Sequence, residues 1–253
     1  MSSIFLWDLD YYEILILIIL ILVTPAIQLL RKNHSIKEIG FNFDVTTLHN
    51  SAFTLIFLLL TIVSVYFLSL LFWGNAYFST AFQFFGINFL EVIFYIIILA
   101  VIEELVFRGI AFRILLDNFG GITALIITSI VFMLAHSLNN YISLVAYINI
   151  FFAGILMGLM YIKSRSVYPM IIFHAGWNLI LAFVIGSPVS GISYTSYKNT
   201  DQNKLSEFML GGSFGLEEGF LTTILLFIMI FTVIKFFKES PKVLSLEFKR
   251  YYS

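Results

Sequence analysis

Long runs of apolar residues, separated by short polar or turn-forming stretches, dominate this sequence. A run of about 20 apolar residues can cross the ~30 Å hydrocarbon core of a bilayer as a helix. The pattern therefore predicts an all-α, multi-pass transmembrane helical bundle of about seven spans, with six to eight allowed. The apolar segments lie at 14–30, 51–73, 89–116, 122–138, 141–162, 167–186 and 219–237.

The third apolar segment, at 89–116, is longer than one straight crossing requires. A helix of this length would measure about 42 Å at 1.5 Å per residue. A segment longer than the hydrocarbon core tilts, kinks or breaks. We therefore predict that this span is tilted or broken.

Composition supports a membrane protein with one domain. The chain is 60% hydrophobic and 11% charged, with a mean hydropathy of +0.98, which is far from the values of soluble domains. Its net charge of -1 gives no reason to expect a nucleic-acid partner. We see no repeat and no hinge-length linker, so residues 1–253 are expected to form a single transmembrane domain, with 90–186 as its core.

Lysine and arginine are distributed unevenly between the two sides of a seven-span chain. Most of them fall in loops on one side of the predicted spans. The loops on the other side have only Lys198 and Lys204. Basic loops stay in the cytoplasm, so we predict a multi-pass cell-membrane protein with its N-terminus outside and its C-terminus in the cytoplasm. The residues on the basic side are Arg31, Lys32, Lys37, Lys163, Arg165, Lys235, Lys238, Lys242, Lys249 and Arg250.

Two adjacent glutamates and an arginine interrupt the third apolar segment. A charge at bilayer depth costs about 2.5 to 3.5 kcal/mol on insertion scales, so such residues usually face a protein interior and serve a function. Glu104 and Arg108 are four residues apart, which places them on one helix face as an ion pair. Glu103 points about 100° away, and an unpaired buried carboxylate suits a general base. The alternative is a structural ion network of all three residues.

Two histidines and an asparagine interrupt the fourth and sixth segments. His174 and Asn178 are four residues apart and share a helix face. His136 alone would more often be a satisfied core residue. However, counting 1.5 Å per residue from the span ends brings Glu103, His136 and His174 to a similar depth, which independent structural roles would not predict.

Two chemistries fit these side chains. In the first, Glu103 and His136 activate water while His174 and Asn178 stabilise an oxyanion. In the second, Glu103, His136 and His174 bind Zn²⁺, which activates the water. The chain has no cysteine and no His-Glu-x-x-His helix, the compact arrangement of many zinc proteases. Both chemistries remain open on the residues alone, although we expect that no cofactor is needed.

The order and spacing of these residues resemble the CAAX-protease and bacteriocin-processing (CPBP, Abi) family of intramembrane glutamic endopeptidases. The resemblance covers roughly residues 90–186. It implies a helical bundle with a conical intramembrane cavity, and a mechanism in which the first glutamate and the first histidine activate water. The second histidine and the asparagine would stabilise the oxyanion, and the second glutamate and the arginine would support the site. The three motifs are Glu103-Glu104-x-x-x-Arg108, Phe132-x-x-x-His136 and His174-x-x-x-Asn178.

We therefore predict an intramembrane endopeptidase that hydrolyses a peptide bond of a small peptide or a membrane protein, toward the cytoplasmic side of its cavity. One alternative is a non-catalytic membrane scaffold or a bacteriocin immunity protein that acts through a regulatory membrane partner. A weaker alternative is a proton-coupled transporter with Glu103 and His136 as a relay. The loop at 187–215, which contains a glycine-rich stretch, is predicted to be an ordinary exposed connection.

Overall fold

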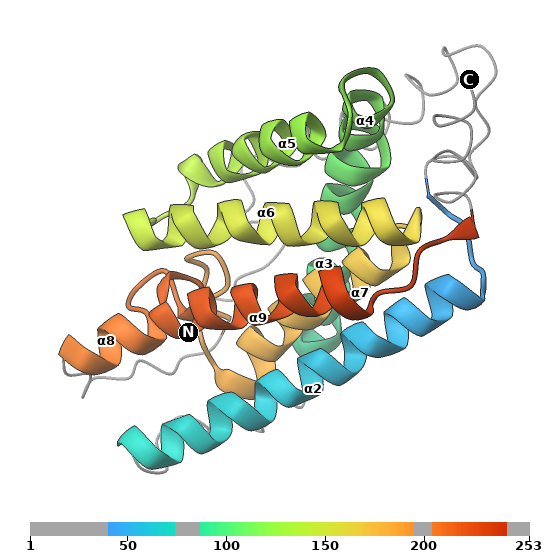
Figure 1. Cartoon of the computed structure of the whole chain (residues 1–253). Helices are drawn as coiled ribbons and strands as arrows, with labels where there is room; N and C mark the ends of the chain where they lie inside the picture. Colours follow the sequence, from blue (N-terminus) through green and yellow to red (C-terminus); the bar gives the residue numbers. More distant parts are fainter. Residues whose placement is uncertain (1–39, 74–86, 195–203, 242–253) are drawn as a thin grey trace.

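The computed structural model describes residues 40–73, 87–194 and 204–241, and these residues form a bundle of helices (Figure 1). The only β-type pairing in these ranges is an isolated bridge between Val189 and Ile192. The predicted all-α membrane bundle is confirmed. The first predicted span, at 14–30, lies outside the described residues.

Five helical segments coincide with predicted spans. Four of them are long and apolar enough to cross a membrane, and α9 is apolar but shorter. The helix α7 continues into a π-helical stretch, η6, at Ile180–Ile185. The bounds are α2 at Val45–Trp73, α5 at Gly121–Ala135, α6 at Leu144–Ser164, α7 at Tyr168–Leu179 and α9 at Phe220–Phe236.

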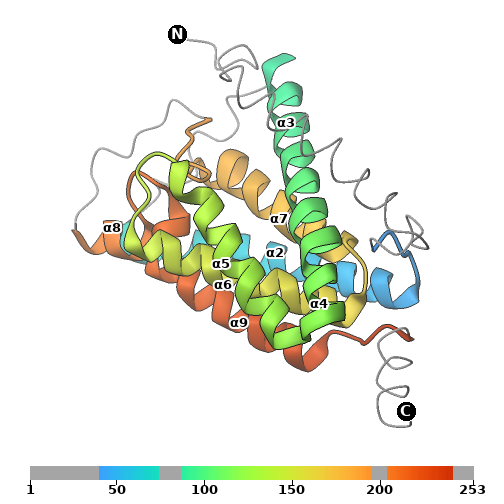
Figure 2. The same ribbon diagram turned by 90° about the horizontal axis from the view of Figure 1, so that it is seen from above.

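The long third segment is a helix whose hydrogen-bond pattern changes in the middle. It comprises α3 at Ile87–Glu104, the π-helix η4 at Leu105–Phe112 and α4 at Arg113–Phe119. It crosses α6 and α9 steeply, as the two views show (Figures 1 and 2). The segment is thus inclined to α6 and α9, and wide π turns replace the α-helical turns in its middle. Such turns often mark functional positions, and here they begin directly after the two glutamates.

The helix α6 occupies the centre of the bundle. It packs between α5 and α9, while α7 packs against α2 and α3. Close approach of α5 and α6 depends on glycine, because a Cβ at Gly154 would lie 2.9 Å from Ser129. Small residues let the backbones of membrane helices approach closely, and the van der Waals contacts that result stabilise the helix pair.

Apolar side chains also cover much of the outer surface. On α2, Leu59 is 61% exposed and Phe67 is 63% exposed. An apolar surface on a spanning helix is expected, since lipid tails are as apolar as leucine.

The connection between α7 and α9 differs from the prediction. It contains α8 at Lys204–Leu210 and a 3₁₀ turn, η7, at Leu216–Glu218. Phe214 and Leu216 are fully buried, so this part of the loop folds onto the bundle. At Gly215 the φ angle of 105° brings the backbone close to the carbonyl oxygen of Pro188, where a side chain would clash. The prediction of an ordinary exposed loop was therefore wrong for the stretch before α9.

Candidate active site

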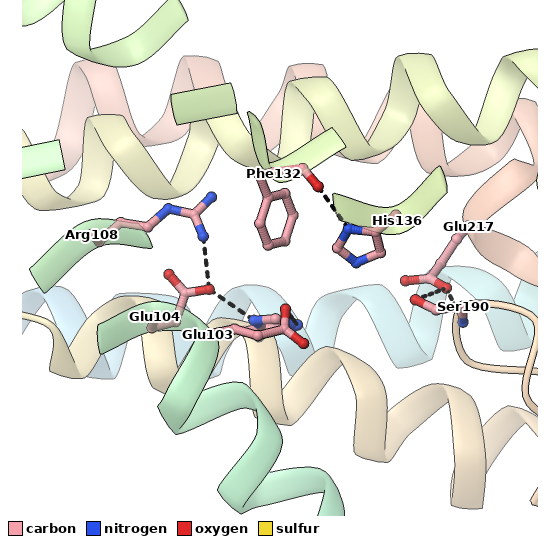
Figure 3. Close-up of polar contacts among 8 residues, drawn as sticks. Glu103, Glu104, Arg108, Phe132, His136, Ser190 and Glu217 are labelled. Carbon is pink, nitrogen blue, oxygen red and sulfur yellow. Dashed lines mark hydrogen bonds and ion pairs between the residues drawn. The ribbon is translucent and has the colours of Figure 1, made fainter. Parts of the chain in front are cut away.

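The second glutamate of the pair forms the centre of a buried ion cluster. A guanidinium nitrogen of Arg108, Nη1, donates to Oε1 of Glu104 at 3.0 Å, and both side chains are fully buried. Nδ1 of His174 lies 2.8 Å from the same oxygen. Because a carboxylate only accepts hydrogen bonds when ionised, Nδ1 is the donor. We call Glu104, Arg108 and His174 the ion cluster; it joins the third helical segment to α7 (Figure 3).

The first glutamate has a different environment from its neighbour. Its Oε2 lies 3.9 Å from Nε2 of His174, and its side chain is 24% exposed. This oxygen is buried and has no hydrogen-bond partner among the described residues. Glu104 pairs with Arg108 as predicted, and Glu103, predicted to be unpaired, lies within ion-pair distance of His174. His174 lies between the two carboxylates, which stabilise the ring when both of its nitrogens are protonated.

An aromatic ring covers the arginine of the ion cluster. The guanidinium carbon of Arg108 lies 4.4 Å from the centre of the Phe132 ring and 5.7 Å from that of Phe107. A cation over a ring face at this distance is stabilised by the ring's quadrupole. The phenylalanine of the second motif thus shields the guanidinium, a contact that sequence reasoning did not predict.

His136 is held at the end of α5 by its own helix. Its Nδ1 lies 2.8 Å from the carbonyl oxygen of Phe132, an acceptor, so Nδ1 carries the proton. In the neutral ring, Nε2 is then an acceptor. The ring of Phe132 lies 4.7 Å from that of His136 and fixes its orientation. An acceptor nitrogen held in this way is suited to bind a water molecule.

A pocket of about 510 Å³ lies between α5, α6, α7 and α9. Three of the predicted catalytic residues line it, namely His136, His174 and Asn178. Among the described residues that line the pocket, Glu103 is absent, although it contacts the pocket residue His174. The other lining residues are Phe132, Asn149, Ile150, Ala153, Met157, Phe173, Trp177, Ser190, Glu217, Thr222 and Leu226.

The pocket lies toward the end of the bundle that carries the α5–α6 connection and the loop before α9. Its residues come from the end of α5, the end of α7 and the start of α9. Lys163 and Arg165 lie at the opposite end of α6. In the predicted orientation, this end of the bundle would face the outside.

The loop between α7 and α9 contributes a carboxylate to the pocket that the sequence analysis did not select. Oε2 of Glu217 accepts hydrogen bonds from both the backbone N–H and the hydroxyl of Ser190. The backbone carbonyl of Glu217 accepts a bond of 2.8 Å from the Asn149 side chain. Burial raises the pKa of Glu217, and the bonds from Ser190 act in the opposite direction. The available sequence signal was the acidic residue two positions after Gly215, the last glycine of Gly211-Gly212-x-x-Gly215.

The three proposed zinc ligands do not form a metal site in this geometry. Within the described ranges, no group of three His, Asp or Glu side chains converges closely enough to hold a metal ion. Each histidine keeps Nε2 as a potential ligand, because Nδ1 is engaged with Phe132 in one case and Glu104 in the other, as is common for metal-binding histidines. Zinc binding by Glu103, His136 and His174 would instead require the three side chains to move closer together.

Comparison with known proteins gives a family match. Residues 85–180 match the family described as type II CAAX prenyl endopeptidase Rce1-like. This stretch of the chain is therefore similar to the CAAX-protease family. The matched stretch contains the three motifs, so the predicted resemblance is confirmed. No curated protein and no solved structure matches the chain significantly.

Proposed function

We propose that this chain is an intramembrane endopeptidase that cleaves a small peptide or a membrane protein by direct attack of water. The family match supports CAAX-type intramembrane protease activity in general. The observation that carries the specific proposal is the contrast between the two glutamates. Although Oε2 of each glutamate is buried without a hydrogen-bond partner among the described residues, Oε1 of Glu104 is bound by Arg108 and His174 within 3.0 Å, whereas Glu103 reaches His174 only at 3.9 Å. A carboxylate in the position of Glu103 can therefore accept a proton from water.

In the proposed reaction, water enters between Glu103 and His136. His136 accepts a hydrogen bond from the water through Nε2, and Glu103 removes a proton as the oxygen attacks the peptide carbonyl. The oxyanion that forms is stabilised by N–H groups of His174 and Asn178. Glu103 then returns the proton to the leaving amine.

The ion cluster supports this reaction without touching the substrate. Because Nδ1–H of His174 is donated to Glu104, the ring can offer Nε2–H to an oxyanion only when it is doubly protonated. Glu104 stabilises that charged ring, and Arg108 balances the charge of Glu104. Glu104 and Arg108 are thus proposed as positioning residues.

The proposed mechanism needs no metal ion. The arrangement of Glu103, His136 and His174 described above supports this view, because the three side chains do not form a coordination group. We expect purified active protein to contain far less than one zinc per chain by elemental analysis, and activity to survive a chelator. Stoichiometric zinc, lost together with activity in His136→Ala, would establish the zinc mechanism instead.

The function is tested by comparing peptides from cells that lack the gene and are complemented with different variants. Wild type and Glu103→Gln are expressed at matched abundance, with Glu91→Gln as a control, because Glu91 is an exposed glutamate on the same helix. A product restored by wild type and Glu91→Gln, and missing with Glu103→Gln, is the expected result. Full rescue of the phenotype by Glu103→Gln with unchanged peptides would favour the scaffold or immunity alternative.

The topology is a separate proposal. We propose an outside N-terminus and a cytoplasmic C-terminus, because the basic residues gather on one side of the predicted spans. The chain lacks cysteine, so a single introduced cysteine can be labelled without background. Serine-to-cysteine replacement at Ser190 should be labelled by an impermeant reagent from outside, and labelling only after permeabilisation would reverse the topology.

A further inference from the structure

The pocket contains one carboxylate that the proposed reaction does not use. Glu217 lines the pocket together with His136, His174 and Asn178, but it belongs to the loop before α9 rather than to the three motifs. In Figure 3 its carboxylate points toward the side of the pocket where His136 lies. The role of this residue is therefore a question separate from water activation.

The carboxylate of Glu217 is held in place from two sides. Ser190 donates both its N–H and its hydroxyl to Oε2. The backbone is fixed by Asn149, which donates to the carbonyl oxygens of Glu217 and Gly219 and accepts a bond of 2.7 Å from Thr223. We call Asn149, Ser190 and Glu217 the pocket rim. Because Oε2 is engaged by Ser190, the second oxygen, Oε1, remains for a ligand.

The pocket has no permanent positive charge to balance this carboxylate. No lysine or arginine occurs among its lining residues in the described ranges. Arg108 lies on the other side of the Phe132 ring in Figure 3 and is paired with Glu104. Burial raises the pKa of Glu217, although the facing His136 and His174 lower it, and a partly buried carboxylate without a lysine or arginine partner carries a desolvation cost. A cationic ligand would offset that cost.

The remaining pocket walls suit the apolar part of such a ligand. The rings of Phe173 and Trp177 stack with their centres 6.2 Å apart and line the pocket, as do Ile150, Met157 and Leu226. Lysine and arginine side chains bury their methylene groups along apolar surfaces while the charged end finds a polar partner. Aromatic walls add attraction for a cation.

We propose that the pocket rim selects substrates with an alkylammonium or guanidinium group close to the scissile bond, which pairs with Glu217. The inference rests on the proposed function only in taking the ligand to be a peptide. Lysine or arginine side chains and a free N-terminal amine share this chemistry, and the experiment separates them. Glu217 acts in recognition and takes no part in proton transfer from water.

The test measures peptide binding rather than cleavage. The probes are apolar pentapeptides, acetylated and amidated, with one lysine at each position in turn. Each has a counterpart with norleucine, which keeps the chain length and lacks the charge. A further set contains norleucine and a free amino terminus. The full-length protein carries Trp7→Phe, Trp73→Phe and Glu103→Gln, so that fluorescence reports the pocket residue Trp177 and cleavage is slow.

We expect at least one cationic peptide to bind roughly tenfold more tightly than its norleucine partner. The free energy of a hydrogen bond to a charged group corresponds to about this ratio of dissociation constants. Glu217→Gln, which keeps an oxygen acceptor for Ser190, should remove the preference. Glu218→Gln is the matched control. Its carboxylate accepts from the backbone N–H groups of Gly212 and Phe214 and does not line the pocket.

Ser190→Ala provides a second variant if Glu217→Gln folds poorly, because it keeps the charge and removes one bond that positions it. A several-fold reduction of the preference is expected there. Equal affinity for charged and uncharged peptides in the parent protein, including no binding of either, would overturn the inference, as would an intact preference in Glu217→Gln. Selective binding together with absent proteolysis would instead count against the proposed function alone.

Discussion

The ion cluster and the pocket rim both surround a buried carboxylate, but they stabilise it in different ways. Glu104 accepts from a guanidinium and an imidazole within 3.0 Å. Glu217 accepts only from the N–H and hydroxyl of Ser190 among the described residues, with no arginine or lysine beside it. The difference indicates that the charge of the first carboxylate is balanced within the protein, although its Oε2 is buried without a hydrogen-bond partner among the described residues, whereas the second retains a capacity to bind a cation. We therefore regard the ion cluster as support and the rim as a surface for ligands.

Disrupting the ion cluster should have the largest effect on stability. Arg108→Ala leaves Glu104 buried without its guanidinium partner, and removal of one member of a buried pair costs about 3 to 5 kcal/mol. We expect strongly reduced abundance in the membrane and a lower midpoint of thermal unfolding in detergent. The double variant Glu104→Leu/Arg108→Met should recover much of the stability. Normal stability of Arg108→Ala would show that the cluster is not needed for folding.

Disturbing the backbone beneath the rim should have a smaller and more local effect. Gly215→Ala places a side chain at a φ of 105° and against the carbonyl of Pro188, and such strain costs about 1 to 3 kcal/mol. We expect faster hydrogen exchange in the 211–219 loop and unchanged exchange in η4. Equal acceleration in both regions would mean that the rim and the cluster unfold together.

Proton uptake at the rim should produce the smallest effect. Since burial raises the pKa of Glu217 above its ordinary value of 4.5, the folded protein binds this proton more tightly than the unfolded chain. The resulting stabilisation is fully present below pH 4.5 and decreases as the pH rises through the folded-state pKa. Glu217→Gln should flatten this part of the stability profile, measured by thermal unfolding in buffers across that range. An unchanged slope would contradict a desolvated carboxylate at this position.

The fold and the ion cluster were largely predictable, because both depend on short-range regularities. Apolar runs located the long helices that the structure describes, and the four-residue spacing of Glu104 and Arg108 predicted their ion pair. The hydrogen bond between Glu104 and His174 was harder to predict. It joins residues 70 positions apart, on helices whose relative rotation no local sequence pattern determines.

The rim and the π-helical turns were not predictable from this sequence by the same means. Glu217 reaches the pocket because glycines let the loop fold back and because Asn149 holds its backbone from another helix. These contacts join residues far apart in the sequence, whereas the local sequence of the loop indicates only a polar connection. The π-helix η4 follows Glu104 without a proline or another local signal, so hydropathy predicted only a long or broken span.

The most direct test of the account compares purified wild type with Glu103→Gln on a peptide substrate found in the complementation experiment. Cleavage by Glu103→Gln should fall at least a hundredfold, because general base catalysis typically contributes a factor of about 10² to 10⁴. Glu91→Gln should cleave at the wild-type rate, and unfolding midpoints should be alike. Cleavage by Glu103→Gln at the wild-type rate would contradict the central claim that Glu103 removes the proton from water.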